Sequence, residues 1–427
     1  ELMETKYYPE INETHYHAKL ENGLNVILIQ KEGFKSSSCF MAFPYGSLDV
    51  KQSIGKHIQE YPSGIAHFLE HKLFENNNGS DIMETFSHLS ANVNAFTSHT
   101  ETVYYFNSSK KNIKKPLQLL LDFVQQLSIT DASVEKEKGI IVQELRMYMQ
   151  MPEQRLILET YQSLFHKNPI RLDIGGNEES VNSITRELLE RCYELNYHPS
   201  NATLVCITPN KPEVILNWIK ENQEKKHFNK FIEIERVLDN EPKEVNRKEF
   251  EFEMDIQASK MTYTFKVPET SKNNKDNLLK EWKIRLFLEL IFSPINPSYE
   301  KWMSEQRIHD YFGYEVEINH EYGYVMFYGE NEDKEDFTRL IHEGLESDIT
   351  QFETYFEQLK RRYFAQLLRQ FDDQDDYALT LIRTKFSGLS VTDAIESLKL
   401  VEFNDLLSIK DDIKQMDTAF VKMNKKA

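Results

Sequence analysis

Cysteines and long apolar runs are scarce in this chain. The 427 residues include three cysteines, Cys39, Cys192 and Cys206, which are far apart in sequence and form no CxxC pair. They provide no disulfide framework, so a reducing compartment, the cytoplasm, is favoured. No uninterrupted apolar run reaches the roughly 18 residues of a membrane-spanning helix, so we expect no membrane insertion. The first residues, 1–6, also lack the basic start and apolar core of a signal peptide.

Positive charge is also in short supply. There are 51 Lys and Arg residues against 69 Asp and Glu, which gives a formal net charge of -18. Because phosphate binding requires a basic surface, we expect no nucleic-acid partner. The acidity is compatible with basic or neutral peptides as ligands, and equally with a role in solubility alone.

The length indicates several domains. At 427 residues, of which 40% are hydrophobic and 28% charged, the chain has the composition of a globular protein with an ample core. A segment rich in Glu, Lys and Asn, residues 221–248, indicates a linker. Beyond it the order of elements recurs: residues 287–289 repeat the Phe-Leu-Glu of residues 68–70, and Leu286 stands where a histidine precedes that triplet. This recurrence indicates that the second half is a copy of the first, and the alternative is two unrelated α/β domains.

Strand and helix patterns alternate through the first half. Residues 15–48 indicate a β-meander that opens with an Asn-Gly hairpin turn, and the polar residues 49–62 indicate a loop. Residues 91–106 are dense in aromatic and β-branched side chains and predict paired strands. A helix is predicted over residues 133–151, where a proline ends it, and a strand over residues 202–207.

The stretch of residues 64–74 predicts an amphipathic helix that carries chemistry. His67 and His71 are about one turn apart, so both imidazoles leave one face, with Glu70 beside them. Two neutral imidazoles can hold a zinc ion, and an adjacent unligated carboxylate can take a proton from metal-bound water. The pattern His-x-x-Glu-His is a signature of zinc peptidases. The alternative is a helix with two surface histidines and a solvated glutamate. Gly79 is expected to cap the helix end.

These residues resemble the motif of the pitrilysin, insulysin and mitochondrial-processing-peptidase superfamily, and the chain is similar to its bacterial two-domain members. The family takes its third zinc ligand from a glutamate on a later helix, which the resemblance identifies with Glu144. Glu137 lies about two turns earlier on the same face. The resemblance makes it the carboxylate that supports a ligating histidine; the alternative is an exposed glutamate paired with a lysine. One Zn2+ per chain is thus implied, held by His67, His71 and Glu144, with Glu70 as general base.

Two further segments resemble substrate-binding parts of the family. Asn94, Ala95 and Phe96, followed by Thr97, resemble the segment with which members bind peptide backbone as an added strand. The alternative is an ordinary core strand. Arg307 and Tyr314 have the spacing of a pair that donates hydrogen bonds to substrate oxygens, and the alternative is a surface arginine and a strand aromatic.

The resemblance also implies an assembly and a fold. In two-domain members the Arg–Tyr pair usually reaches the zinc of another subunit, so a homologous partner is expected, as a homodimer or a heterodimer. The fold class is α+β, with two homologous α/β sandwich domains, each a mostly antiparallel sheet packed with helices. The N-terminal zinc-binding domain covers residues 1–220, the linker residues 221–248, and the C-terminal domain without metal ligands residues 249–427.

The expected function is a zinc-dependent endopeptidase or oligopeptidase. It would cleave short or unfolded peptides, leader or precursor peptides among them, in an enclosed cavity. The alternative is a non-catalytic homologous subunit of a heterodimeric processing peptidase that acts in substrate binding. A structural zinc site is disfavoured because such sites are usually rich in cysteine, and no cysteine lies near the motif.

Overall fold

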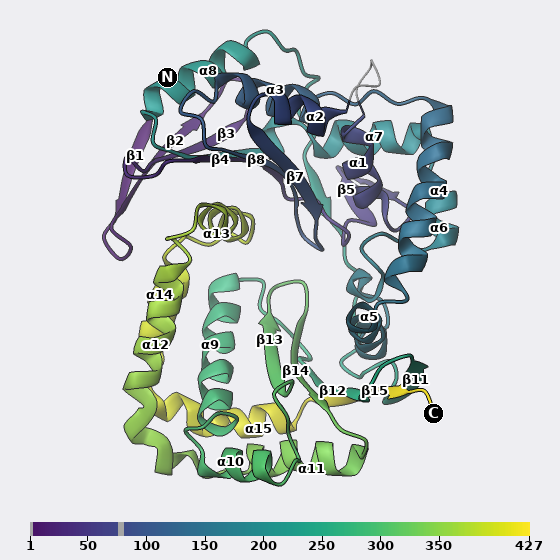
Figure 1. Cartoon of the computed structure of the whole chain (residues 1–427), viewed down its shortest axis with the longest axis vertical. Coiled ribbons are helices and arrows are strands. Elements are labelled where there is room, and N and C mark those ends of the chain that lie inside the picture. The colour runs from purple at the N-terminus through teal and green to yellow at the C-terminus, as the bar shows by residue number, and fades with distance from the viewer. Residues whose placement is uncertain (1–2, 76–80) are drawn as a thin grey trace. The chain divides into compact units, whose positions relative to one another are not determined.

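The computed structural model describes residues 3–75 and 81–427. The chain forms two compact units that are interleaved along the sequence (Figure 1). Unit 1 comprises Glu1–Arg146, Asp173–Val237 and Gln370–Phe386, and unit 2 comprises Met147–Leu172, Leu238–Arg369 and Ser387–Ala427. Each half of the sequence therefore contributes one segment to the unit built mainly by the other half. The division expected from the sequence, at residues 220 and 249, does not include these exchanged segments. The expected helix cap at Gly79 lies outside the described residues.

Unit 1 is built on a seven-stranded sheet in the order β1-β2-β3-β9-β4-β8-β7. The strands are β1 (Glu4–Tyr8), β2 (Glu13–Lys19), β3 (Asn25–Gln30), β4 (Ser37–Phe43), β7 (Ala91–Thr97), β8 (Thr102–Ser108) and β9 (Thr203–Thr208). The β3–β9 pair is parallel and the other pairs are antiparallel. The expected meander is wrong at one point, because β9 lies between β3 and β4. Every residue of β4 and β9 is buried. Strands that are buried on both faces belong at the centre of a covered sheet, which is where β4 and β9 lie.

Polar residues form a second, smaller sheet in unit 1. The expected loop at residues 49–62 holds the hairpin β5 (Lys51–Ile54) and β6 (His57–Glu60). Its outer partner is β10 (Ile234–Arg236), which lies inside the expected linker. Arg236 binds the carboxylate of Asp49, with Nη2 2.7 Å from Oδ2. This part of the linker is therefore fixed to unit 1.

Unit 1 also contains several α-helices. They are α1 (Ile65–Leu73), α2 (Ile82–His88), α3 (Lys114–Val124), α4 (Asp131–Tyr148), α6 (Glu178–Asn182), α7 (Arg186–Asn196), α8 (Pro212–Gln223) and α13 (Gln374–Phe386), with a short 3-10 turn at Pro199–Asn201. The apolar sides of α1, α3 and α4 join one core with the sheet. Helix α13 comes from the second half of the sequence and packs on β4 and β9. Figure 1 shows it on the face of the sheet opposite α3 and α8.

Unit 2 has a five-stranded sheet in the order β11-β15-β12-β14-β13. The strands are β11 (Glu249–Met254), β12 (Lys260–Lys266), β13 (Gly313–Ile318), β14 (Gly323–Glu330) and β15 (Asp417–Lys425), and only the β11–β15 pair is parallel. Its α-helices are α5 (Pro152–Leu164), α9 (Asn274–Ile291), α10 (Pro297–Ser304), α11 (Lys334–Leu345), α12 (Phe356–Arg369), α14 (Asp393–Leu400) and α15 (Ile409–Lys414). Short 3-10 segments lie at Pro169–Arg171, Ile349–Tyr355 and Phe403–Ser408. Helix α5, from the first half, packs on β15 and β12.

Two mostly antiparallel sheets packed with helices confirm the α+β class. Helix α5 starts at Pro152, where the sequence predicted a break, because proline suits the first turn of a helix and ends the one before it. Among the described residues, no helix combines the length and the apolar character needed to span a lipid bilayer.

Candidate metal centre

Helix α1 presents His67, Glu70 and His71 on one side and buries the other side in the core of unit 1. It starts after Gly64, whose φ of 90° lies in the left-handed region that favours glycine. A side chain at Gly64 would also collide with the backbone of Gly175, since a Cβ atom there would lie 2.3 Å from its carbonyl oxygen. The loop that contains Gly175 thus packs directly against the start of α1.

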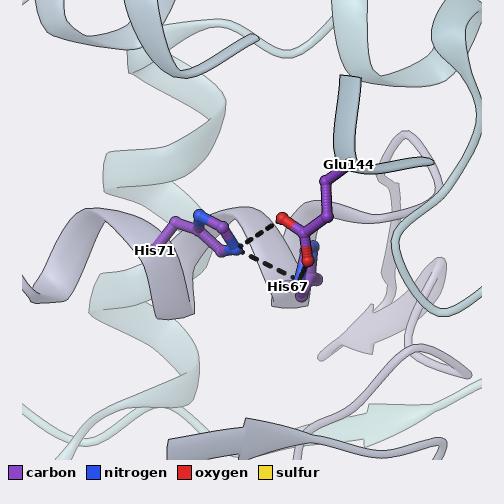
Figure 2. A group of neighbouring side chains, drawn as sticks. All are labelled: His67, His71 and Glu144. Carbon is purple, nitrogen blue, oxygen red and sulfur yellow. Dashed lines mark hydrogen bonds and ion pairs between the residues drawn. The ribbon is translucent and has the colours of Figure 1, made fainter. Parts of the chain in front are cut away.

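Glu144, on α4, faces the two imidazoles of α1 (Figure 2). The Nε2 atoms of His67 and His71 are 3.2 Å apart, and the Glu144 carboxylate oxygens lie 3.7 Å from the first and 3.3 Å from the second. Two donors bound tetrahedrally to one zinc ion lie about 3.3–3.5 Å apart. The three side chains therefore fit a zinc ion, and a tetrahedral ion would keep a fourth position for water. Burial and the neighbouring His71 lower the pKa of His67 to about 4, so this imidazole is neutral, as a ligand must be.

Glu137 supports His71 from the side away from the other ligands. His71 Nδ1 lies 2.7 Å from Glu137 Oε1 and donates its proton there, which leaves Nε2 free to act as a ligand. Burial disfavours the charged carboxylate, but the His71 hydrogen bond and the nearby charges of His71 and Lys72 together outweigh it and lower the pKa of Glu137. Glu137 and Glu144 lie on the same helix, so α4 supplies both a candidate ligand and the group that orients another one.

Glu70 lies beside the candidate ligands and has a separate partner. The hydroxyl of Thr97, the last residue of β7, donates a hydrogen bond of 3.0 Å to Glu70 Oε2. Burial raises the pKa of Glu70 above its ordinary value, towards the range in which a carboxylate can both accept and return a proton. Thr97 was not among the predicted site residues. Its place directly after Asn94, Ala95 and Phe96 was the signal in the sequence, but its contact with Glu70 requires the tertiary structure.

Asn94, Ala95 and Phe96 lie on β7, which ends the order of the large sheet and, within the described part of the chain, pairs with β8 alone. Asn94 is exposed, and Ala95 and Phe96 are half-buried. The Asn94 side chain accepts a hydrogen bond of 2.8 Å from the Ala95 N–H. An edge strand of this kind can accept an extended peptide as a further strand.

Arg307 and Tyr314 lie in unit 2 and bind different partners. Arg307 precedes β13 and pairs with Asp336 at 3.0 Å and with Glu343 at 3.3 Å. Tyr314, on β13, donates its hydroxyl proton to Glu289, which lies on α9. The structure thus brings His67, Glu70, His71, Glu137 and Glu144 together in unit 1, whereas Arg307 and Tyr314 form contacts within unit 2.

Comparisons with known proteins give the family. Residues 26–177 match the family model described as "Insulinase (Peptidase family M16)", and residues 183–363 match "Peptidase M16 inactive domain". An uncharacterized zinc protease of Bacillus subtilis, YmfH, is 34% identical over 406 residues, which is 94% of each chain. A crystal structure of an M16-like peptidase from Alicyclobacillus acidocaldarius superimposes with a TM-score of 0.88 at 27% identity, over 99% of each chain.

A more distant relative is the mitochondrial-processing peptidase subunit beta of Rattus norvegicus, which is 26% identical over 171 residues, 39% of this chain and 33% of that subunit. The two family models cover both halves of the chain in succession, and the B. subtilis relative matches almost its whole length. The chain therefore belongs to the insulinase family of peptidases, M16, in the pitrilysin superfamily, and has the two-domain form of its bacterial members.

Proposed function

We propose that this chain is a zinc-dependent endopeptidase or oligopeptidase that cleaves short or unfolded peptides, leader or precursor peptides among them. The observation that carries the proposal is the convergence of His67, His71 and Glu144 at distances that suit one zinc ion, with Glu70 beside them. Three protein ligands with one open position are typical of catalytic zinc sites, whereas structural sites have four. Membership of a peptidase family supports the same reaction.

Each side chain of this site has a separate role in peptide hydrolysis. When bound, zinc supplies a Lewis acid that polarises the scissile carbonyl and acidifies water. Glu70 accepts the proton of the attacking water and returns it to the departing amine, and its raised pKa suits both steps. Thr97 holds Glu70 in place through its hydroxyl. Glu137 fixes the ring of His71.

The peptide would bind as an added strand on β7. Asn94, Ala95 and Phe96 lie on this edge strand, which packs against α1 and so brings a bound backbone to the metal centre. Recognition of main-chain groups gives affinity with little dependence on side chains. We therefore expect broad sequence tolerance.

We further propose that a homologous subunit completes the site, in a homodimer or a heterodimer that encloses the substrate. Arg307 and Tyr314 would then donate hydrogen bonds to substrate oxygens at a zinc centre. Similarity to a mitochondrial-processing peptidase subunit beta supports the expectation of a partner. The three cysteines are free in the structure, which is compatible with the predicted cytoplasmic location.

The second candidate function is a non-catalytic subunit that binds substrate for an active partner. Similarity to a named subunit of a processing peptidase favours this reading. The arrangement around Glu70 favours the enzyme instead, because a subunit that only binds peptide does not need a half-buried carboxylate beside the candidate ligands.

Glu70→Gln tests the proposal directly. It removes the base and leaves the three ligands, so we expect normal zinc content and a loss of cleavage of about 100-fold or more. Zinc would be measured by elemental analysis and cleavage with a peptide library, with and without a homologous partner subunit. Glu84→Gln, an exposed glutamate on α2, is the matched control. Cleavage at the wild-type rate by the Glu70→Gln chain would remove Glu70 as the base.

A further inference from the structure

Lys72 is a fully buried lysine on the helix that carries the metal motif. It directly follows His71 on α1, and its side chain is 0% exposed. A buried ammonium group is costly unless it is paired and hydrogen-bonded. An apolar residue would bury the same side of the helix without this cost. The lysine therefore requires an explanation beyond packing.

Among the residues that the structure describes, the ammonium group of Lys72 has three polar neighbours. Its Nζ lies 2.6 Å from Glu75 Oε1, donates a hydrogen bond of 3.2 Å to the Ser133 carbonyl, and lies 3.8 Å from Glu137 Oε2. Glu75 is near the end of α1, whereas Ser133 and Glu137 are on consecutive turns of α4. Lys72 thus ties α1 to the helix that supplies both Glu137 and Glu144.

Glu137 is held between two consecutive side chains of α1. Its Oε1 accepts the proton of His71 Nδ1 at 2.7 Å, and its Oε2 faces Lys72. A carboxylate that is held at only one oxygen can still pivot about that contact, which moves its other oxygen. A positive charge near Oε2 restrains that rotation, and the restrained carboxylate in turn fixes the plane of the imidazole.

We infer that Lys72 is a positioning residue of the metal centre, which acts through Glu137 to set the orientation of the His71 ring. The inference rests on the proposed zinc function, because the contacts from Lys72 to Glu137 and from Glu137 to His71 matter only if His71 Nε2 must point at a metal ion. Partners behind a ligand typically change metal affinity by 10–100-fold, and Lys72 is one step further away. We expect the charge of Lys72 to strengthen zinc binding about tenfold.

A purely structural role is the rival explanation. In that case Lys72 would serve only to join α1 to Glu75 and to the Ser133 carbonyl, and the metal centre would be affected only through general loosening of the two helices. The two roles differ in their dependence on Glu137. A positioning role requires Glu137 as intermediary, whereas a structural role does not.

A double-mutant cycle on the full chain separates the two roles. The zinc dissociation constant would be measured by competition with a chromogenic chelator for the wild type, Lys72→Met, Glu137→Gln and the double variant. We expect Lys72→Met to weaken zinc binding about tenfold in the wild type and to have no further effect beside Glu137→Gln. Lys72→Arg, which keeps the charge, should restore most of the affinity. Thermal melts of the zinc-free chains check folding.

Glu75→Gln is the matched control. It removes the nearest ion-pair partner of Lys72 and leaves Glu137 untouched, so zinc affinity should stay within about twofold. If Lys72→Met does not fold, Lys72→Gln removes the charge but keeps a donor for the Ser133 carbonyl, and enters the same cycle. The inference would be overturned if the chain without the Lys72 charge bound zinc as tightly as the wild type. It would also be overturned if loss of that charge weakened zinc binding equally with Glu137 and with Glu137→Gln. Because zinc binding is measured without turnover, a failure of Glu70 as base would leave this result intact.

Discussion

The hydroxyl of Thr97 donates a hydrogen bond of 3.0 Å to Oε2 of Glu70, and so links the last residue of β7 to the proposed base on α1. The strand that would bind the peptide and the group that would activate water are thereby joined by one contact. A substrate that extends β7 would bind next to the residue that orients the base. The link predicts a specific effect on catalysis.

Replacing Thr97 with valine should slow turnover and leave zinc bound. A hydrogen bond to a charged group contributes about 1.5–3 kcal/mol, so we expect kcat to fall by about 10–100-fold. Burial raises the pKa of Glu70 and the Thr97 hydrogen bond lowers it, so loss of the hydroxyl should raise it further. The acidic limb of the pH–rate profile should then move to higher pH. Thr97→Ser keeps the donor and should restore both properties; an unmoved profile for Thr97→Val would contradict this role.

Removal of a candidate ligand should remove the metal. His71→Ala and Glu144→Gln each leave two of three ligands, so we expect zinc affinity to fall by more than the 10–100-fold typical of supporting residues. Elemental analysis after dialysis measures how much zinc each variant keeps. Glu135→Gln, an exposed position on α4 that pairs with Lys138, is the matched control and should retain zinc. A Glu144→Gln chain that keeps stoichiometric zinc would show that this carboxylate is not a ligand.

Local patterns were sufficient to predict much of unit 1. The spacing of His67, Glu70 and His71 within an apolar stripe predicts their shared face, and the spacing of Glu137 and Glu144 predicts theirs. The structure shows these two faces opposed. Their catalytic and metal-binding roles stay a proposal, but the geometry that such roles require follows from helical periodicity and the family motif.

Long-range pairing was beyond such patterns. Strand β9 lies between β3 and β4, although most of the first half separates it from them in sequence. Strands β5, β6 and β10 are short and polar, so alternation of apolar residues gives no signal for them. Lys72 was missed for a related reason: a charged residue in a sequence is normally assigned to the surface, and only the neighbouring Glu75 and Glu137 explain its burial.

Zinc affinity should rise with pH through the titration of His71. Burial lowers the pKa of His71, but the hydrogen bond to Glu137 and the nearby carboxylates outweigh it and raise that pKa above 6.5. Below the raised pKa a proton must be displaced before zinc binds, so affinity should fall by about tenfold for each pH unit on the acidic side and level off on the alkaline side. His67, with a pKa of about 4, is already neutral near neutral pH and so does not add to the pH dependence of zinc affinity there.

Chelator competition between about pH 5.5 and 8.5 measures this profile. In Glu137→Gln the partner that raises the His71 pKa is lost, so the levelling point should move to lower pH. A flat profile in the wild type would contradict the prediction, as would an identical levelling point in the two chains.

The close approach at Gly64 predicts a loss of stability on substitution. Gly64→Ala places a Cβ atom at a φ of 90° and against the Gly175 carbonyl. The left-handed conformation alone costs about 1–2 kcal/mol, and the collision adds to it. Urea denaturation of the full chain measures the free energy of unfolding. Gly139→Ala is the matched control, because Gly139 lies within α4 with open space around it and should gain about 0.5–1 kcal/mol. Equal stability of the two variants would contradict the close approach.

Tyr314 tests whether a second subunit completes the site. Tyr314→Phe removes one hydroxyl donor, so zinc content should be unchanged while cleavage slows, and Tyr355→Phe, an exposed tyrosine of unit 2, should have no effect. In a homodimer with shared sites, mixing Tyr314→Phe chains with Glu70→Gln chains creates one site with an intact base and an intact tyrosine. Activity of the mixture should then exceed that of the Tyr314→Phe chains alone. A mixture with no gain, together with full turnover at dilutions where the chain is monomeric, would place the whole site in a single chain.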